Sequence, residues 1–357
     1  MKIGVQARLL AEPYTGVGSY TEHLFTKLAQ DHPEDEYTLF TYKKVTTTFP
    51  KNIKIKVIPE KKWLLLASLK KGYWERFQVP KFFKNFDIIH HTYPNLAPGG
   101  IVTIHDVIPW KNKKYRASLR SKTYFHLVKK ALKKADKILA VSQTTKKEAV
   151  KYLGLSPKKI TVTYEAADPE YLRPANKNPI DPPYLLYVGG YDERKNIDYL
   201  IEVFSKTKHP NLKLVLAGGK VKNTSLYDSH NLQKSSKNDK INLLKTGFVS
   251  IEELNALYRG AQALINLSKE EGFNLPILEA AYAKTPAITS DIEVHRELYG
   301  NKVLLLTLND PEKAAENLRK FLENKPMQQK LAATTKELRE KYTWEKTAKA
   351  VRIAYGG

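Results

Sequence analysis

The chain has 357 residues, 42% hydrophobic and 27% charged, so it is long enough for two domains and has the composition of a globular protein. It contains no cysteine, which excludes disulfides and thiolate metal sites, and it has no run of 18 apolar residues that would span a bilayer. The net charge is +23, of which residues 1–180 contribute +18 from 33 Lys/Arg and 15 Asp/Glu, and such a field attracts nucleic acid, anionic membranes or phosphorylated substrates.

Seven strand-like runs alternate with helical patterns in the first half of the chain. Several of them are nearly continuous apolar runs, as expected for strands buried on both faces of a parallel sheet. They span residues 2–8, 37–42, 53–58, 87–92, 101–106, 137–142 and 160–166. We therefore predict a doubly wound, Rossmann-like α/β domain over residues 1–170.

A glycine turn, TGVGSYTEHL (15–24), follows the first of these strands. Gly16 and Gly18 would let the backbone approach a ligand closely, and the next helix would offer free N–H groups at its N-terminus. That geometry suits a phosphate. A purely structural glycine turn is the alternative explanation.

Two segments, residues 61–86 and 111–137, interleave basic and apolar side chains. Trp and Leu on one side of a helix, with Lys on the other, are typical of a helix lying in the headgroup layer of an anionic membrane. The residues that we expect to contact lipid are Trp63, Leu66, Lys70, Lys129 and Lys133, with Trp74 also counted in the apolar stripe. The alternative is that the tryptophans belong to the core and the lysines are only solvated.

Three histidines lie at predicted strand ends. His105 ends the strand in TIHDVIP (103–109), where its ring can face a ligand and donate to a substrate hydroxyl or carbonyl. His90 and His91 end the strand in DIIHHT. For each of the three, a structural histidine with satisfied hydrogen bonds is the alternative.

The second half of the chain repeats the α/β pattern after a break at residues 168–183, which are rich in Pro, Asn and Asp and which we interpret as a linker. Six strand-like runs follow at residues 184–190, 212–219, 241–247, 263–268, 286–290 and 303–308. They predict a second Rossmann-like domain over residues 171–342.

Other segments of the second half have patterns of their own. Residues 196–206 and 250–260 are amphipathic helices, and the second begins with a capping box of Ser250 and Glu253 and ends at Gly260. The polar stretch 220–240 is interpreted as a long surface loop. A helix from about Thr343 ends the chain, and we expect residues 343–357 to pack back onto the first domain.

The motif VGGYDERKNIDYL (188–200) follows the first strand of the second domain. Its Arg194 and Lys195 come at the start of a helix, where the macrodipole disfavours cations. Their position is favourable if a dianion lies between them and the helix amides. The alternative is an exposed pair of basic residues.

Two carboxylates bracket the apolar stretch EGFNLPILEA (271–280). Glu271 lies in a loop after a strand, and Glu279 lies one turn into a helix that has Pro276 in its first turn. A carboxylate that accepts from two vicinal hydroxyls binds a ribose, and free amides at residues 273–275 can meet phosphate or sugar oxygens. The pattern predicts a sugar-nucleotide site that needs no metal, because no paired carboxylates of the DxD type follow a strand.

With these motifs the sequence resembles the retaining glycosyltransferases of family 4, which have the GT-B architecture of two Rossmann-like domains facing a cleft. EGFNLPILEA resembles the Glu-seven-Glu motif of that family. The companion motifs are TGVGSYTEHL, TIHDVIPW, ILAVS, YVGGYDERKNIDYLIEVF, LVLAGG, GFVSIEELNALYRGA and YTWEKTAKAVRIAY. The resemblance covers nearly the whole chain and is more specific in the second half.

The resemblance implies a role for each motif residue. Gly16 would lend an amide to the diphosphate of the donor, Arg194 and Lys195 would stabilise the departing phosphate, and Glu271 would touch the transferred sugar. The donor-binding set is completed by the amides of Phe273, Asn274 and Leu275 and by the ribose ligand Glu279. His105 would contact the donor sugar or the acceptor near the reacting carbon, and the catalytic residues would be His105, Glu271, Arg194 and Lys195. Many members carry Arg where this chain has Gly190, and Gly where it has Asn274.

We therefore expect a retaining, metal-independent hexosyltransferase without a cofactor, similar to bacterial enzymes that add mannose or a related hexose in surface-polysaccharide assembly. Its donor would be GDP-mannose or a UDP-hexose and its acceptor a glycan or lipid-linked glycan. The apolar run at the N-terminus is too short for a signal peptide, so we expect a cytoplasmic enzyme, peripheral at the inner face of the membrane. The alternatives are a basic nucleic-acid-binding protein, for which no module is found, and another enzyme of this fold, such as a sugar-nucleotide epimerase or a phosphorylase.

Overall fold

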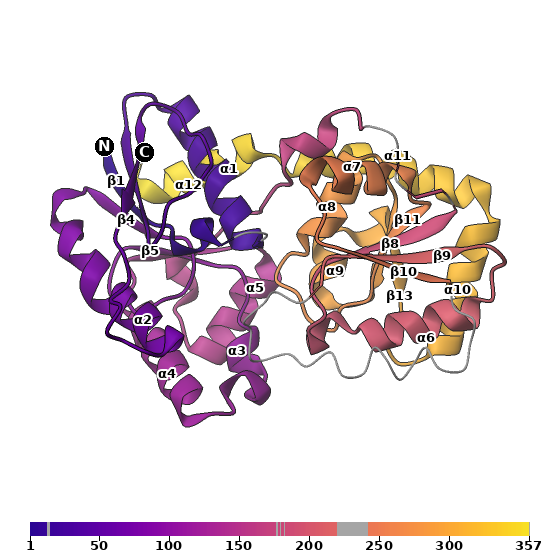
Figure 1. The fold of residues 1–357 in the computed structure, drawn as a ribbon, viewed down its shortest axis with the longest axis horizontal. Coiled ribbons are helices and arrows are strands. Elements are labelled where there is room, and N and C mark those ends of the chain that lie inside the picture. Colours follow the sequence, from indigo (N-terminus) through magenta and orange to yellow (C-terminus); the bar gives the residue numbers. More distant parts are fainter. Residues whose placement is uncertain (13–14, 176–177, 179, 182, 220–241, 357) are drawn as a thin grey trace. The chain divides into compact units, whose positions relative to one another are not determined.

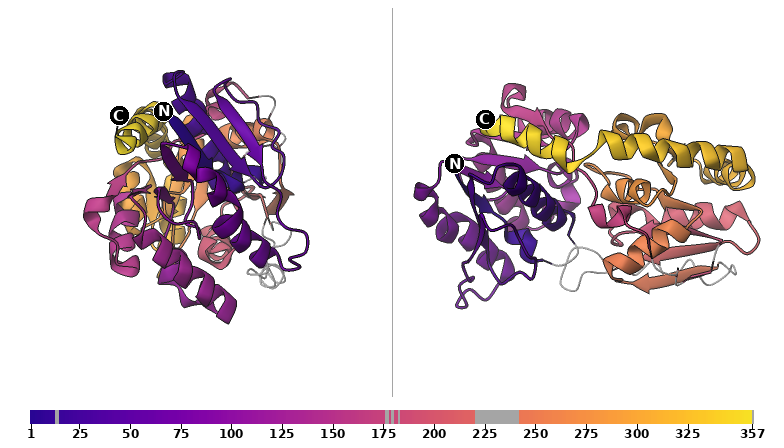
Figure 2. Two further views of the ribbon diagram at one scale, coloured as in Figure 1. Left: turned by 90° about the vertical axis from the view of Figure 1, so that its left-hand side faces the viewer. Right: turned by 90° about the horizontal axis from the view of Figure 1, so that it is seen from above.

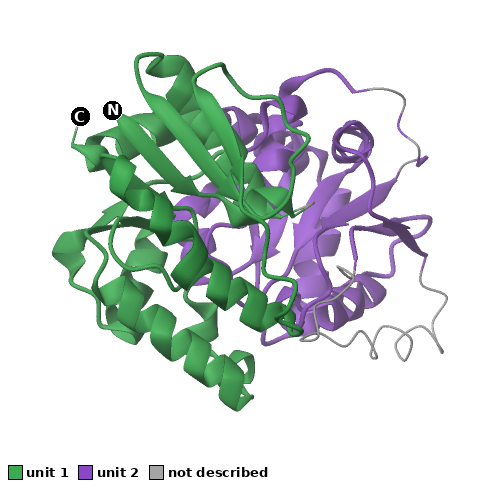
Figure 3. Cartoon of the chain, turned by 60° about the vertical axis from the view of Figure 1, so that its left-hand side comes forward, with its two compact units in different colours: residues 1–166, 343–357 green, residues 167–342 purple. Residues whose placement is uncertain are grey.

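The chain forms two compact units, residues 1–166 with 343–357 and residues 167–342 (Figure 3). The computed structural model describes residues 1–12, 15–175, 178, 180–181, 183–219 and 242–356. The stretch 220–240, interpreted above as a surface loop, lies outside the described residues.

Unit 1 is built on a sheet of seven strands in the order β3-β2-β1-β4-β5-β6-β7, in which every neighbouring pair is parallel (Figure 1). The strands are β1 (Lys2–Gln6), β2 (Glu36–Thr41), β3 (Ile53–Val57), β4 (Ile88–His91), β5 (Ile101–Ile104), β6 (Lys137–Ala140) and β7 (Ile160–Val162). Each of them lies on one of the seven runs predicted from the first half of the sequence, so that part of the prediction is confirmed.

The main helices of unit 1 are α1 (Gly16–Asp31), α2 (Ala67–Tyr73), α3 (Ile108–Lys111), α4 (Leu119–Lys133), α5 (Gln143–Glu148) and the C-terminal α12 (Trp344–Tyr355). Helix α12 lies beside α1 (Figure 2). Its Trp344 and Val351 are buried in one hydrophobic core with Ile3 and Leu24. The last helix of the chain is therefore part of the first unit, because it buries an apolar face there.

Unit 2 contains a second parallel sheet, of six strands in the order β10-β9-β8-β11-β12-β13. The strands are β8 (Tyr184–Val188), β9 (Lys213–Ala217), β10 (Leu243–Gly247), β11 (Ala263–Asn266), β12 (Ala287–Ser290) and β13 (Leu304–Leu306). All six predicted runs are confirmed. Most of their side chains are apolar, and those of β8, β9, β11 and β12 are almost all buried, as in a doubly wound sheet covered by helices. The edge strand β10 is more exposed.

The helices of unit 2 are α6 (Ile197–Thr207), α7 (Ile251–Gly260), α8 (Leu275–Tyr282), α9 (Glu293–Leu298), α10 (Pro311–Glu323) and α11 (Lys325–Lys341). Helix α7 begins with the predicted capping box, in which the Ser250 hydroxyl accepts from the Glu253 amide and the Glu253 carboxylate accepts from the Ser250 amide. Helix α7 also ends at Gly260 as predicted.

Strand order positions the loops that carry the candidate site. In unit 2, β8 and β11 are neighbours and parallel, so the loops that follow them leave the same edge of the sheet side by side. Ligands of open parallel sheets bind beyond this carboxyl edge. Two doubly wound parallel sheets are the fold class that the sequence predicts.

Candidate active site

The loop after β11 leads into helix α8 through a left-handed residue. Asn274 has φ 75° and ψ 64° and is the N-cap of α8, with Pro276 in the first turn. Glycine adopts this region freely, and asparagine is the next most tolerant type. This explains why Asn274 can stand at a position where the resemblance leads us to expect Gly. The amides at the start of α8 are thus presented as a ready anion site.

A buried histidine holds this turn in place. The Nδ1 of His295 donates to the Ser290 carbonyl at 2.8 Å, which leaves Nε2 to accept from the side-chain amide of Asn274 at 3.0 Å. Burial lowers the pKa of His295 to about 4, so the ring is neutral. The Tyr299 hydroxyl donates to the carbonyls of Phe273 and Asn274 at 2.9 and 3.2 Å. Neither His295 nor Tyr299 carries a motif that sequence reasoning could have used.

An ion-pair cluster links the two neighbouring loops. Glu271 follows β11, while Arg194 and Lys195 lie in the helical turn η8 (Glu193–Lys195) after β8. The Lys195 ammonium lies 2.6 Å from Glu271 Oε1, and the Arg194 guanidinium lies 2.8 Å from Oε2. Arg194 also contacts Asp192 at 3.0 Å. The three residues that the sequence predicts for the phosphate and sugar are therefore brought together.

The cluster stays charged although it is largely buried. Burial alone would raise the pKa of Glu271, but the charges of Lys195 and Arg194 outweigh it and hold that pKa at about 2. Burial lowers the pKa of Lys195, partly offset by Glu271. Lys195 is 8% exposed, so it is not the exposed basic residue of the alternative interpretation. Charges fixed in this way need little reorganisation when a charged group develops beside them.

Glu279 has a different environment in the same motif. It lies in helix α8, and its carboxylate accepts a 2.6 Å hydrogen bond from the hydroxyl of Tyr258 on α7. Burial raises the pKa of Glu279 to about 7, although the hydrogen bond from Tyr258 acts in the opposite direction. Part of the Glu279 side chain still reaches solvent. Tyr258 is a partner that the sequence motif does not indicate.

In unit 1, Gly16 is the first residue of helix α1 and is exposed. The N-cap is Thr15, whose hydroxyl accepts from the Gly18 amide at 3.1 Å. A Cβ on Gly18 would lie 2.7 Å from the Thr15 hydroxyl and 2.9 Å from the Leu9 carbonyl. Gly18 is therefore required by close packing, whereas Gly16 sits at the helix N-terminus where the sequence predicts an anion contact.

His105 follows β5 and is held at both ring nitrogens. Nδ1 lies 2.6 Å from Glu165, and Nε2 lies 2.9 Å from the Thr92 carbonyl. Burial alone would lower the pKa of His105, but the charge and hydrogen bond of Glu165 outweigh it, and the pKa lies above its ordinary value. Both partners are acceptors, so both contacts are satisfied at once only by a ring that is protonated at both nitrogens. Sequence reasoning missed Glu165, which lies inside the predicted run 160–166 but follows the observed strand β7, which ends at Val162.

His90 and His91, by contrast, are structural histidines. His90 lies 2.6 Å from the Tyr355 hydroxyl and 2.8 Å from the Thr103 hydroxyl, and His91 lies 2.6 Å from the Gln6 side chain. Both are fully buried, and burial lowers their pKa values to about 3 and about 4.

Comparison with known proteins decides the family. The family described as Glycosyl transferases group 1 matches residues 169–338, and Glycosyltransferase Family 4 matches residues 14–171. An O-antigen chain mannosyltransferase, RfbU, from Salmonella typhimurium is 31% identical over 260 residues, which are 71% of this chain and 70% of that protein. The chain belongs to this glycosyltransferase family. Membership favours glycosyl transfer over the nucleic-acid-binding alternative.

Other known proteins are similar to this glycosyltransferase over nearly its whole length. An O-antigen chain mannosyltransferase from Escherichia coli is 24% identical over 99% of both chains. Among solved structures, WaaG, a glycosyltransferase involved in lipopolysaccharide biosynthesis, has a TM-score of 0.76 at 17% identity over 100% of both chains. HepE from Anabaena in complex with UDP-glucose has a TM-score of 0.74 at 14% identity, covering 100% of this chain and 99% of that one. These structures confirm the predicted GT-B fold class.

The basic segments of the glycosyltransferase are only partly as predicted. Trp63 and Leu66 are exposed, as is Lys133, and Lys70 is half-buried. The Lys129 ammonium, however, donates to the Tyr152 carbonyl at 2.9 Å. Lys129 is thus engaged within unit 1, contrary to the expectation of a lysine directed at lipid.

The prediction that Trp74 belongs to the lipid-facing apolar stripe is wrong. It is fully buried, and its indole nitrogen donates to the Ile58 carbonyl at 2.6 Å. The reason is local geometry: residues 67–85 form α2 followed by the short helices η2 (Trp74–Gln78) and η3 (Val79–Asn85), which turns Trp74 into the core. No helix in the described part of the chain is both long and apolar enough to cross a bilayer.

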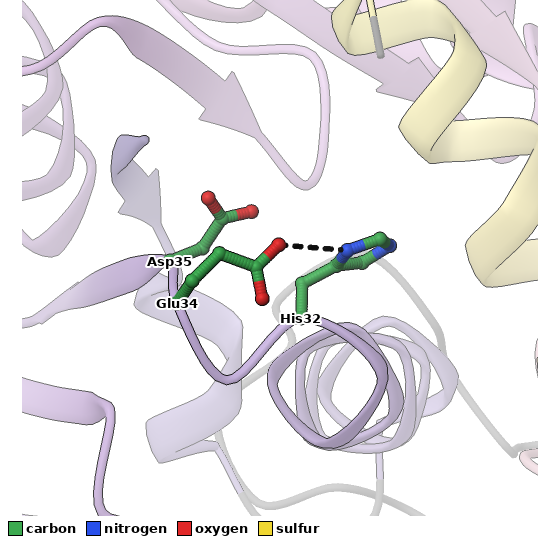
Figure 4. A group of neighbouring side chains, drawn as sticks. All are labelled: His32, Glu34 and Asp35. Atoms are coloured by element: carbon green, nitrogen blue, oxygen red, sulfur yellow. Dashed lines mark hydrogen bonds and ion pairs between the residues drawn. The ribbon is translucent and has the colours of Figure 1, made fainter.

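One group of potential metal ligands, His32, Glu34 and Asp35, occurs among the described residues (Figure 4). His32 Nδ1 lies 3.2 Å from Glu34. Asp35 contacts the N-terminal ammonium of Met1 at 2.5 Å and Arg352 at 3.0 Å. These ion pairs account for the group and tie α12 to the start of the chain. That the reaction needs no metal remains a prediction.

Proposed function

We propose that the protein is a retaining hexosyltransferase that moves mannose, or a related hexose, from a nucleoside-diphosphate sugar to a hydroxyl of a lipid-linked or polysaccharide acceptor. The names of the relatives support the choice of sugar, since two of them are O-antigen chain mannosyltransferases. The UDP-glucose complex of a protein with the same fold supports a nucleotide sugar as donor.

The observation that carries this proposal is the Glu271–Arg194–Lys195 cluster beside the N-terminus of α8. Breaking the bond between the anomeric carbon and the diphosphate leaves negative charge on the departing oxygen. Fixed cations and helix amides are the groups that stabilise such charge best. In the proposed site the diphosphate lies between these amides and Arg194 and Lys195.

The remaining residues bind the rest of the donor in this proposal. Glu271 touches the transferred sugar, with the amides of Phe273, Asn274 and Leu275 beside it. Glu279 accepts from the ribose hydroxyls, for which its partly exposed carboxyl group is suited. Gly16 and His105 lie in unit 1, and their roles, Gly16 toward the diphosphate and His105 toward the donor sugar or the acceptor, stay predictions.

A panel of nucleotide sugars tests the donor and the stereochemistry together. We expect GDP-mannose or a UDP-hexose to be consumed, and the product to keep the anomeric configuration of the donor when its signal is followed by NMR. Inversion at the anomeric carbon would contradict the retaining assignment. Activity should persist in EDTA, and a loss that magnesium restores would contradict the metal-independent site.

We also propose that the enzyme works at the inner, cytoplasmic face of a membrane, where a lipid-linked acceptor would be found. The support is the exposure of Trp63 and Leu66 within a strongly basic segment. Co-sedimentation with vesicles should require anionic lipid, fall with salt and weaken when Trp63 and Leu66 are made polar. If the protein ignores anionic vesicles at low salt, a soluble acceptor is the better assignment.

A further inference from the structure

Unit 1 has a large apolar groove that the proposed reaction does not use. It lies between α2 with η2 on one side and α4 on the other, and its volume is about 1240 Å³. Leu69 and Phe77 line one wall, and Leu119 and Leu127 line the other. All four side chains are exposed, Leu119 to 81%. Ordinary small-molecule pockets measure roughly 300–1,000 Å³, so this groove suits a longer apolar group.

The charged residues around the groove are all basic. Arg76, Arg120, Lys130, Lys133 and Lys134 lie along it, and the residues lining it include no Asp or Glu. Glu75 of η2 does not line the groove; it is fully buried and accepts from the hydroxyls of Tyr93 and Tyr124 at 2.9 and 3.1 Å. The charged side chains that line the groove are therefore all positive.

An apolar trough with a cationic rim is complementary to one kind of ligand, an amphiphile with a hydrocarbon chain and an anionic head. A concave surface lined by several exposed apolar side chains is typical of a binding site. A neutral apolar ligand would account for the apolar side chains of the groove but not for the basic residues along it. A soluble anion would account for the basic residues but not for the apolar side chains.

We propose that this groove seats the hydrocarbon chain of an anionic, lipid-linked acceptor, with the phosphate of the lipid against Arg76, Arg120 and the lysines of α4. This rests on the proposed function, because it specifies the class of acceptor. It differs from general adhesion to a membrane, which needs a flat face and no groove for one chain.

Binding of dodecyl phosphate below its micelle concentration, followed by calorimetry, tests the groove. We expect saturable binding of one molecule, and no measurable binding of butyl phosphate. Leu69→Gln and Leu127→Gln, on opposite walls, should each weaken binding by about tenfold or more, the effect of losing a buried leucine contact. Leu172→Gln, an equally exposed leucine in unit 2, is the matched control and should bind normally.

Removing one positive charge tests the role of the basic residues along the groove. Arg120→Gln should weaken dodecyl phosphate binding about fivefold, the effect of one cation near an anionic group, and the difference should shrink in high salt. Dodecyl maltoside, which has the chain without the charge, should bind more weakly than dodecyl phosphate and be insensitive to Arg120→Gln. Lys336→Gln, on the exposed face of α11, is the control for a lost surface charge.

Three outcomes of these experiments would contradict the proposal. Equal binding of dodecyl phosphate and dodecyl maltoside would mean that the rim selects nothing. Vesicle binding that depends on Leu69 and Leu127, without any binding of dodecyl phosphate, would mean bilayer adhesion, and self-association that Leu69→Gln disperses would mean a dimer face.

Donor use is measured on the same variants to keep the two proposals separate. Dodecyl phosphate binding by a protein that consumes no hexose donor would support the groove and refute the proposed function. Donor consumption with no binding of dodecyl phosphate would refute the groove alone.

Discussion

Glu271 and Glu279 lie eight positions apart in one motif, and they differ in the charge of their hydrogen-bond partners. Glu271 is bound by two cations, and its pKa is held at about 2. Glu279 meets a neutral phenol, and burial raises its pKa to about 7. Glu271 therefore serves as a fixed anion that positions two cations. Glu279, with the same type of side chain, is an acceptor whose charge depends on pH and on what binds it.

The largest effect expected from this comparison is on the cation cluster. Lys195→Ala removes one of the two positive charges held by Glu271, so transition-state stabilisation of the leaving diphosphate should fall. We expect turnover to drop by roughly 10²–10³-fold in steady-state kinetics, as for other preorganised electrostatic contacts. Lys336→Ala, a solvent-exposed lysine of unit 2, is the control. Normal turnover in Lys195→Ala would mean that the cluster is only structural.

A smaller effect is expected from the titration of Glu279. Its carboxylate is protonated below a pH of about 7, so affinity for a nucleoside diphosphate should fall by up to about tenfold per pH unit as the pH is lowered from 7. Tyr258→Phe removes the hydrogen bond that lowers this pKa, so the midpoint should move to higher pH. A flat affinity between pH 6 and 8, apart from titration of the phosphate itself, would show that the charge of Glu279 does not matter.

The ionisation of Glu279 also makes the free energy of unfolding depend on pH, in the direction opposite to that of a carboxylate in an ion pair. The folded-state pKa of Glu279 is raised above its unfolded value, so ionisation is harder in the folded protein. Its stabilising contribution is therefore present at low pH and lost as the pH rises from about 4.5 to about 7. Glu279→Gln should gain stability relative to the wild type at pH 8 but not at pH 4, as measured by chemical unfolding.

The smallest expected effect extends the comparison to two histidines. His105 has two acceptor partners and a raised pKa, whereas the Nε2 of His295 accepts from the Asn274 side chain and the pKa of His295 is about 4. Glu165→Gln removes the carboxylate that outweighs burial, so the pKa of His105 should fall below its ordinary value in an NMR titration. His295 should stay neutral in both proteins. An unchanged His105 titration would mean that Glu165 does not hold its proton.

Much of the fold could be predicted because it depends on local pattern. The thirteen strands, the capping box of Ser250 and Glu253, and the start of α8 before Pro276 follow from apolar runs, cap chemistry and proline geometry. These features involve residues within a few positions of one another. The clustering of Arg194, Lys195 and Glu271 was also predictable, because parallel strands place their carboxyl-end loops at one edge.

The rest depends on partners that are distant in sequence. Glu165 lies 60 positions from His105, and Tyr258 lies 21 positions from Glu279. Trp74 is buried because short helices turn it inward, which no periodicity over residues 61–86 could indicate. Lys129 meets a carbonyl of another segment. In each case the tertiary structure, not the local pattern, decides what the side chain contacts.

The measurement that tests the central claim most directly is binding of a nucleoside diphosphate and of its 2′,3′-dideoxy analogue to the wild type and to Glu279→Gln. If Glu279 accepts from the ribose hydroxyls, the wild type should lose roughly tenfold or more in affinity for the dideoxy analogue, as for a lost hydrogen bond to a charged group. The variant should bind the two ligands nearly equally. Equal discrimination by both proteins would contradict the assignment of Glu279 to the ribose, and with it the donor site proposed for unit 2.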